Sequence, residues 1–409
     1  MMSCRRVTTI GFLAAAFSHL LSAAEPLPFT IKLETLHKYA GSDWQWFHPR
    51  PAAAPRRGEN GAPFSLITIQ KHLHGVSDYY SGLYAMTSRN LGKTWDGPIE
   101  IPELGWTKES EEVDVAVADV TPGWHARTGK FIAVGAQVRY SKKGTQLDDR
   151  PSSHQTSYAV YDPKKNSWSR WKTIAMPREP KFNFVRSACA QWLVKPDGTV
   201  LLPFYFGLNA TKPHSVTVAE FRFDGAELRY VRHGTEFELN VVRGLVEPSL
   251  VEFQGKYYLT LRNDLRGYVT SGADGLHFEP IREWRFDNGD ELGSYNTQQH
   301  WLAHSDGLFL AYTRKGANND HVIRHRAPLF LAQVDPATLR VMRATEQILM
   351  PDRGATFGNF GAAAITAAES WVTDTEGMFG KAARERGAEG ATYLARVVWS
   401  KPNRSVRVR

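Results

Sequence analysis

The amino-acid sequence predicts an all-β protein. Long amphipathic helical patterns are nearly absent from its 409 residues. Instead, β-rich runs alternate with turns that contain glycine, which is typical of antiparallel hairpins. No stretch rich in proline, glycine and serine divides the chain, so the hairpins are expected to form one domain, residues 25–409.

Four hairpins can be placed in chain order by their turns. These turns are Pro196-Asp197-Gly198, Asp224-Gly225, Gln254-Gly255 and Asp306-Gly307, each between two β-rich runs. Turns of this kind suit the twist of antiparallel strands. Hairpins repeated along such a long chain predict radial repetition, a six- or seven-bladed β-propeller. A pair of β-sandwiches is the structural alternative.

The N-terminal segment is expected to be an export signal. Arg5 and Arg6 precede an apolar run, Ile10 to Leu21, that is too short to span a bilayer comfortably. The small residues Ser-Ala-Ala follow at 22–24, as a signal peptidase requires. We therefore expect residues 1–24 to be removed and the mature protein to be periplasmic or secreted. A retained anchor is the alternative for this segment, and no later stretch predicts a membrane span.

Cysteine content and charge restrict the class of function. Cys189 is the one cysteine outside the leader, so no internal disulfide is expected. We expect a small core residue there, with a reactive thiol as the alternative. The chain carries 50 Lys+Arg and 42 Asp+Glu, net +8, without a basic stripe or a nucleic-acid motif. This pattern disfavours nucleic acid as a partner and favours an anionic substrate.

One turn carries a recognisable motif. The run Ser88 to Trp95, SRNLGKTW, fits S-x-D-x-G-x-T-W with Asn90 in the Asp place. It resembles the Asp box of sialidase-like β-propellers, and Ser271 to Phe278 is a weaker copy. In this motif the Asx side chain bonds nearby backbone and the glycine takes a positive φ. Trp95 is expected to be buried between blades.

A second stretch resembles the part of sialidases that carries a catalytic Glu and a substrate-binding Arg. It comprises GLVEPS at 244–249 and YYLTLRN at 257–263. The resemblance implies that Glu247 activates a nucleophile and that Asp78 is the acid/base. It also implies that three arginines grip a sugar carboxylate, because guanidinium groups bind carboxylates through two parallel hydrogen bonds. The candidates for this clamp are Arg50, Arg262, and either Arg324 or Arg326.

The sequence departs from sialidases at the nucleophile. A Tyr is expected a few dozen residues after the third arginine, but Arg353 to Phe360 has only Phe at its aromatic positions. Phenylalanine has no hydroxyl to attack a sugar. A sialidase-like hydrolase of this sequence would need another nucleophile or a water.

Further blocks resemble bacterial propellers of polysaccharide-degrading loci, which include ulvan lyases and rhamnosyl-glucuronate lyases or rhamnosidases. The blocks are QKHL at 70–73, SDYYSGL at 77–83, GSYNTQQH at 293–300 and GANNDH at 316–321. The resemblance implies β-elimination, in which His and Tyr move protons and Arg neutralises a uronate carboxylate. The proton-transfer candidates are His48, His72, His125, His300, Tyr80, Tyr205 and Tyr295. Further binding candidates are Arg222, Arg243 and Gln299.

Simpler structural roles stay open for all of these residues. A lone His in a β-rich loop is usually structural or solvated, and single arginines on a propeller are mostly surface ion pairs. The pairs His72/His74 and His321/His325 have no acidic or Cys companion at a known spacing, so no metal site is predicted. Calcium held by propeller loops remains open, and no other cofactor is expected.

The sequence therefore predicts an enzyme that cleaves an acidic, uronate-containing oligo- or polysaccharide in the central depression of a propeller. β-Elimination is favoured over hydrolysis. A sialidase-like exo-glycosidase and a non-catalytic carbohydrate-binding propeller are the alternatives. The sequence predicts no oligomeric state.

Overall fold

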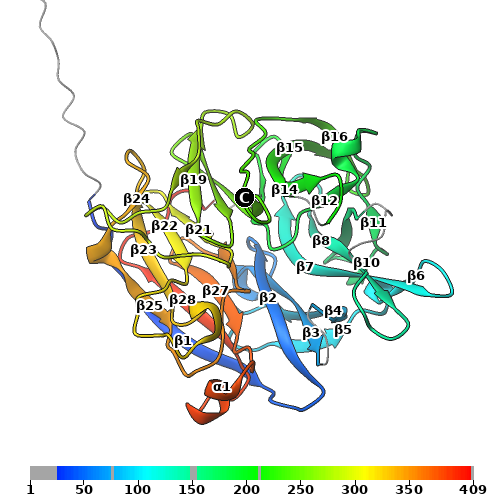
Figure 1. Cartoon of the computed structure of the whole chain (residues 1–409), viewed down its shortest axis with the longest axis horizontal. Coiled ribbons are helices and arrows are strands. Elements are labelled where there is room, and N and C mark those ends of the chain that lie inside the picture. The colour runs from blue at the N-terminus through cyan, green and yellow to red at the C-terminus, as the bar shows by residue number, and fades with distance from the viewer. Residues whose placement is uncertain (1–24, 75–77, 148–153, 211–212, 407–409) are drawn as a thin grey trace, which may run out of the picture.

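Six small antiparallel sheets stand in a ring in the computed structural model (Figure 1). The structure describes residues 25–74, 78–147, 154–210 and 213–406, so the expected leader, 1–24, lies outside the described residues. The ring is a six-bladed β-propeller, which confirms the predicted fold class and selects the lower blade count. Within the described ranges, no helix is long and apolar enough to cross a membrane.

The blades follow one another along the chain. Blade 1 contains β2 (Trp44–Ala54), β3 (Phe64–Leu73), β4 (Tyr80–Ser88) and β5 (Asp96–Glu100). Blade 2 contains β6 (Thr107–Lys108), β7 (Val113–His125), β8 (Lys130–Ser141), β9 (Thr156–Asp162), β10 (Ser167–Trp168) and β11 (Lys172–Thr173). Blade 3 contains β12 (Phe184–Arg186), β13 (Leu193–Val194), β14 (Val200–Gly207), β15 (Ser215–Phe223) and β16 (Leu228–His233).

The second half of the ring is built in the same way. Blade 4 contains β17 (Val246–Phe253), β18 (Lys256–Arg262), β19 (Tyr268–Gly272) and β20 (Arg282–Glu283). Blade 5 contains β21 (His300–His304), β22 (Gly307–Tyr312), β23 (Leu329–Asp335), β24 (Arg340–Val341) and β25 (Gln347–Met350). Blade 6 contains β26 (Gly361–Ala364), β27 (Glu369–Thr375), β28 (Ala391–Trp399) and β1 (Phe29–Lys38).

The connections hold little helix. The single α-helix in the described ranges is α1 (Lys381–Glu385). Short 3-10 turns are η1 (Glu59–Gly61), η2 (Pro102–Leu104), η3 (Pro180–Phe182), η4 (Ile323–His325) and η5 (Arg343–Thr345).

Blade 6 joins the two ends of the described chain. The strand β1 pairs antiparallel with β28, from Phe29 opposite Trp399 to Lys38 opposite Ala391. The backbone N–H of Leu27 also donates to Gln333 Oε1 of blade 5 at 2.7 Å. The ring is therefore closed by main-chain hydrogen bonds between the N-terminal strand and the last strand.

The core is divided into layers between neighbouring blades. Strands such as β22, GLFLAY, are buried along their whole length, because both faces of a blade pack against adjacent blades. One layer packs Phe309 and Leu331 of blade 5 against Tyr393 and Val397 of blade 6. Stacked layers of this kind make the inner strands a rigid frame around the central axis.

The predicted turns are found where expected. The four turns at 196–198, 224–225, 254–255 and 306–307 connect β13–β14, β15–β16, β17–β18 and β21–β22. In the Asp-box turn, Ser88 Oγ accepts the Gly92 N–H at 2.8 Å and Asn90 Oδ1 accepts the Thr94 N–H at 3.0 Å. Trp95 packs on Trp371 of blade 6, with ring centroids 5.8 Å apart. Trp95 is half-buried and not fully buried as predicted, because the flanking turn residues are exposed.

Candidate active site

Each blade places one residue with a positive φ at the same end of the central axis. These residues are His48 (54°), Asp119 (58°), Cys189 (52°), Glu247 (47°), Asn296 (53°) and Gly358 (99°). In blades 1, 2 and 4 the strand register shifts at this point, which indicates a β-bulge. A non-glycine residue in this conformation costs about 1–3 kcal/mol, and such strain is concentrated at functional sites.

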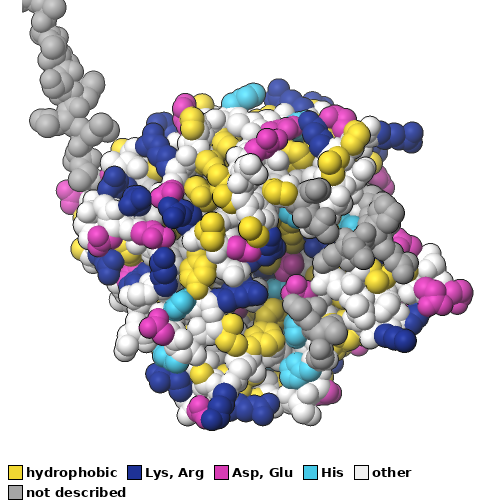
Figure 2. Space-filling model, viewed as in Figure 1, with side chains coloured by type: hydrophobic (Ala, Val, Ile, Leu, Met, Phe, Trp, Pro, Cys, Tyr) yellow, Lys and Arg dark blue, Asp and Glu magenta, His cyan; other side chains and the backbone are white. Residues whose placement is uncertain are grey.

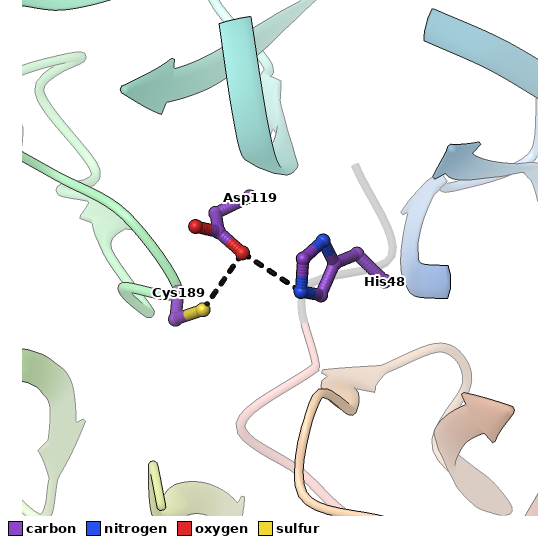
Figure 3. Close-up of side chains that lie close together, drawn as sticks. All are labelled: His48, Asp119 and Cys189. Carbon is purple, nitrogen blue, oxygen red and sulfur yellow. Dashed lines mark hydrogen bonds and ion pairs between the residues drawn. The ribbon is translucent and has the colours of Figure 1, made fainter. Parts of the chain in front are cut away.

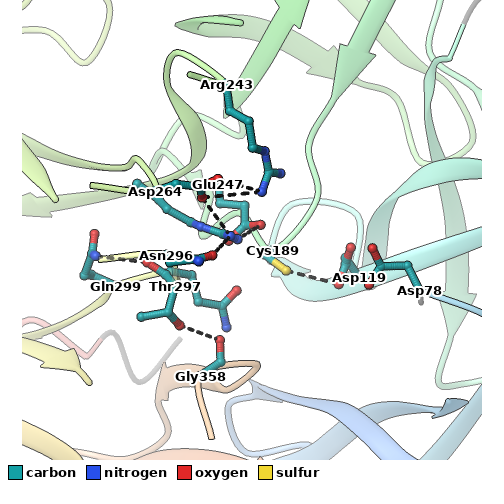
Figure 4. Close-up of polar contacts among 12 residues, drawn as sticks. Asp78, Asp119, Cys189, Arg243, Glu247, Asp264, Asn296, Thr297, Gln299 and Gly358 are labelled. Carbon is teal, nitrogen blue, oxygen red and sulfur yellow. Dashed lines mark hydrogen bonds and ion pairs between the residues drawn. The ribbon is translucent and has the colours of Figure 1, made fainter. Parts of the chain in front are cut away.

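The same end of the ring is hollowed at its centre. Figure 2 shows acidic, basic and histidine side chains in and around this hollow, which we call the central depression. Figure 4 shows Asp119, Cys189, Glu247 and Asn296 arranged around it, from four different blades. The bulges therefore turn polar side chains toward the axis.

Three of these side chains form a contact group on one side of the depression (Figure 3). His48 Nε2 lies 2.9 Å from Asp119 Oδ1. The Cys189 thiol donates to the same oxygen at 3.0 Å. His48 and Cys189 are buried, whereas 19% of the Asp119 side chain is exposed. Asp119 is thus the member of this group that faces the depression.

The surroundings of Asp119 favour its ionised form. Burial opposes ionisation, but the charges of His48 and Arg50 and the hydrogen bonds from His48 and Cys189 hold its pKa well below the usual range. Burial and the charge of Asp119 raise the pKa of the Cys189 thiol. In this state the carboxylate accepts two hydrogen bonds and the thiol keeps its proton.

A second carboxylate, Glu247, lies in blade 4. It contacts the Arg262 guanidinium directly, and Arg262 also reaches Asn296 Oδ1 at 2.8 Å and Asp264 Oδ1 at 3.3 Å. Burial acts against the charge of Arg262, but Glu247 outweighs it and raises the pKa of Arg262. The Glu247 and Arg262 side chains are 12% and 6% exposed, so this ion pair is largely shielded from solvent.

Arg326 differs from Arg262 in its partners. Its Nε donates to the Asn296 carbonyl at 3.2 Å, and its Nη2 donates to the same oxygen. Among the described residues, no carboxylate lies within ion-pair distance of it. Burial and the positive charges of Arg262 and Arg324 lower the pKa of Arg326 to about 10. This guanidinium is therefore placed to gain from an anionic ligand.

Other predicted residues lie at the rim of the depression. Arg243 is 45% exposed and lies 3.4 Å from Asp264. Arg324 is exposed, with a φ of 57°. The exposed Asp78 accepts a hydrogen bond from the Tyr80 hydroxyl at 2.9 Å. These residues surround the depression without closing it.

Three predicted aromatic or imidazole groups lie behind the depression. His72 packs against Phe47, Tyr80 and Phe379, and burial lowers its pKa to about 4. Burial and the charge of Asp78 raise the pKa of Tyr80 well above its usual value. Burial also raises the pKa of Tyr205, although the charge of Arg186 opposes the shift. In these settings His72 is neutral and the two Tyr hydroxyls are protonated at neutral pH.

The other predicted residues are placed in structural positions. Arg50 donates to His300 Nε2 at 3.1 Å, to Gln298 Oε1 at 3.1 Å and to the Phe360 carbonyl at 2.8 Å. His300 is fully buried and its Nδ1 lies 2.7 Å from Ser249 Oγ. These contacts form a polar floor under the depression, so the arginine expected to lead the clamp is held within that floor.

Gln299 and Arg222 lie outside the depression. The Gln299 amide bonds Ser294, Thr297 and Thr260, each at 3.0 Å, so its polar atoms are used within the core. Arg222 is exposed on β15, opposite Arg229 of β16. Neither residue contacts Arg262 or Arg326.

Two more candidates are also engaged elsewhere. His125 bonds the Gly198 carbonyl at 2.9 Å, in the turn between β13 and β14. The Tyr295 hydroxyl bonds His325 Nδ1 at 2.5 Å.

The sequence-based list missed Asp119, Asn296 and Asp374. Asp119 is the lone acid of the apolar run VAVADV at 115–120. A charged residue in such a run could have identified it as a candidate site residue. Cys189 is buried, as expected of a core residue, and its sulfur also donates to the Asp119 carboxylate. Asp374 is buried and accepts the Gly358 and Thr375 N–H groups, each at 2.8 Å. Burial raises the pKa of Asp374 to about 7.

The central channel is also open at its opposite end. A cavity of about 650 Å³ there is lined by all six blades, including Arg50 and His300 at its inner limit. The polar floor described above therefore separates this cavity from the depression.

Comparison with known proteins establishes the fold. No family model and no curated protein sequence matches the chain. Among solved structures, Trypanosoma rangeli sialidase aligns with a TM-score of 0.58 and 11% identity over 90% of this chain and 59% of that chain. The Hadza microbial sialidase Hz136 aligns with a TM-score of 0.60 and 11% identity over 86% and 65%.

An enzyme of similar size has the same architecture. The α-L-arabinofuranosidase Arb93A from Fusarium graminearum aligns with a TM-score of 0.54 and 11% identity over 91% of this chain and 97% of that chain. The chain spans less than two thirds of the two sialidases named above. Identities this low establish a sialidase-like β-propeller fold, and a function must be inferred from the site itself.

Proposed function

We propose that this protein is a carbohydrate-active enzyme that cleaves the glycosidic bond of an anionic sugar in the central depression. The observation that carries the proposal is the arrangement of Arg326 beside the depression without a carboxylate partner. A sugar carboxylate would supply the missing counter-ion, and a charge-assisted bidentate pair would fix its orientation. The solved structures with this fold include sialidases and an α-L-arabinofuranosidase, which supports a glycan substrate.

Hydrolysis is the chemistry that these side chains support best. Glycosidases use two carboxylates to stabilise positive charge at the anomeric carbon and to move a proton. Asp119 and Glu247 are the two acidic side chains of the positive-φ group, on blades 2 and 4. Asp119, held ionised, is suited to stabilise the developing charge or to attack in place of the absent Tyr. Glu247, in its ion pair with Arg262, would accept the proton of an attacking water.

β-Elimination is the second candidate. It is favoured by Arg262 and Arg326, whose charges would neutralise a uronate carboxylate. It is disfavoured by His72, which has no open route to the depression through Phe47, Tyr80 and Phe379.

The test is an incubation with sialylated, uronate-containing and neutral arabinan glycans. New reducing ends without ultraviolet absorbance identify a hydrolase, and absorbance of unsaturated uronates identifies a lyase. We expect Asp119→Asn to lower turnover by about 100-fold or more, the usual weight of such a group. Asp224→Asn, in the exposed turn between β15 and β16, is the matched control. Cleavage of no glycan, or equal cleavage by the Asp119 variant, would contradict the proposal.

A further inference from the structure

His48, Asp119 and Cys189 bring three different donor atoms to one point. An imidazole nitrogen, a carboxylate oxygen and a sulfur lie within 4.8 Å of one another. They come from three neighbouring blades, and Figure 3 shows the side chains directed at each other. His48 and Cys189 approach from the buried side, while Asp119 borders the depression. The group is thus open to the central depression on the side of Asp119.

Ordinary packing does not account for this arrangement. Each of the three residues has a positive φ, between 52° and 58°, and each such residue costs about 1–3 kcal/mol. The second nitrogen of His48, Nδ1, is buried and has no hydrogen-bond partner among the described residues. A buried thiol is usually a small apolar group, yet the Cys189 sulfur lies on a carboxylate. The positive φ is shared by one residue in each of the six blades, and His48 Nδ1 is not the nitrogen that contacts Asp119. The observation particular to this group is that a buried imidazole and a buried thiol both contact one carboxylate oxygen.

The donor set selects a class of ligand. Imidazole, carboxylate and thiolate together suit Zn²⁺ and similar first-row divalent ions, whereas Ca²⁺ and Mg²⁺ prefer oxygen alone. Three protein ligands with an open fourth position are typical of catalytic zinc sites. We propose that His48, Asp119 and Cys189 bind a zinc-type divalent transition-metal ion whose fourth ligand position opens into the central depression.

The geometry requires a small adjustment. Tetrahedral zinc with bonds of about 2.0–2.3 Å holds its donor atoms about 3.3–3.7 Å apart. The two close contacts of Asp119, at 2.9 Å and 3.0 Å, must each widen by about half an ångström. Cys189 releases its thiol proton to solvent when the sulfur binds the ion, and the charge of the group rises by one.

This proposal rests on the proposed function, because Asp119 would act through a metal ion at the same site. Metal binding can be tested without a glycan substrate. The probe is Co²⁺, which reports thiolate ligation by a ligand-to-metal charge-transfer band in the near ultraviolet. We expect one ion per chain with this band, and competition by Zn²⁺. Cys189→Ser should remove the band and weaken binding at least tenfold.

A second control separates this site from other His–Asp pairs. His321 lies 2.6 Å from Asp352 without a cysteine, so His321→Ala should bind Co²⁺ like the unaltered protein, whereas His48→Ala should not. Release of one proton per bound Zn²⁺, from the Cys189 thiol, gives an independent measurement on the unaltered protein. It decides the question if a variant fails to fold.

The outcomes distinguish the two proposals. Absence of the charge-transfer band, or equal Co²⁺ affinity of Cys189→Ser and the unaltered protein, would overturn the metal site. Glycan cleavage that continues in the presence of a chelator would then leave the proposed function standing. Binding with the expected band supports the metal site, even if no glycan is cleaved.

Discussion

Arg326 provides the sharpest prediction at the residue scale. Among the described residues, its guanidinium is hydrogen-bonded only to the Asn296 carbonyl, and it is repelled by Arg262 and Arg324. Arg326→Ala should therefore weaken binding of an anionic glycan by roughly 1.5–3 kcal/mol, the range of hydrogen bonds to charged groups. The dissociation constant is measured by calorimetric titration with the anionic glycan that the protein cleaves fastest.

Arg222→Ala, which removes an exposed arginine of blade 3, is the matched control and should not change affinity. Equal losses in both variants would show that general positive charge, and not Arg326, attracts the ligand.

Asp374 links pH to stability. Its folded-state pKa is raised to about 7, so between about pH 4 and pH 7 the folded protein holds a proton that the unfolded chain has lost. The contribution of Asp374 to the free energy of unfolding should therefore fall as the pH rises through this window, by roughly 4 kcal/mol in total. Buried histidines such as His72, whose pKa burial lowers to about 4, act in the opposite direction. The measured quantity is therefore the free energy of unfolding in urea of the unaltered protein minus that of Asp374→Asn, and this difference should fall across the window.

The exposed-turn variant Asp197→Asn should keep the pH dependence of the unaltered protein's free energy of unfolding between about pH 4 and pH 7. If Asp374→Asn shows the same slope as the unaltered protein, Asp374 is ionised in the folded state.

The sequence could indicate some residues of the site and not others. Glu247 and Arg262 lie in a motif that fixes both their types and their spacing, and the structure pairs them. Arg50 and His300 have equally suitable side chains, but they face each other in the floor. The sequence does not indicate in which direction the side chain of an inner-strand residue points at a bulge. This direction determines whether the side chain lies in the polar floor or in the central depression.

At the scale of elements, the Asp-box turn depends on a glycine. Gly92 has a φ of +69°, and an added Cβ would lie 3.2 Å from both Trp371 and Trp95. Gly92→Ala should cost about 1–2 kcal/mol for the backbone and about 1 kcal/mol more for the crowded rings. Thermal or urea unfolding measures the loss.

Gly61 supplies the matched control, because its φ is +78° with no atom within 4 Å of an added Cβ. Gly61→Ala should show the backbone cost alone. If the two variants lose equal stability, the contact between the turn and blade 6 contributes nothing measurable.

Turns were the elements that the sequence predicted best. The turns at 224–225 and 254–255 lie between consecutive strands as expected, and Gly225 and Gly255 have positive φ, a conformation with a strong local residue preference. The blade count was less accessible. Blade 3 divides its inner edge between β12 and β13, and blade 6 recruits β1 from the opposite end of the chain. Neither feature has a local sequence signal.

At the scale of the whole molecule, β1 should determine whether the ring is stable. Phe29 of this strand packs on Phe309 and Trp399, with centroids 5.5 Å and 5.9 Å away. Removal of residues 25–38 with the leader would expose this layer and leave β28 unpaired. We expect loss of cooperative thermal unfolding, measured by circular dichroism.

A chain that begins at residue 25 is the control and should unfold in one transition. A single sharp transition in the shorter chain would show that five complete blades and part of a sixth suffice.

The pairing of β1 with β28 also sets the order of events in biosynthesis. Its two partners are the first and the last strands of the described residues, so the ring cannot close before β28 has been synthesised. Until then the nascent molecule keeps an unsatisfied sheet edge, exposed to aggregation or chaperone capture.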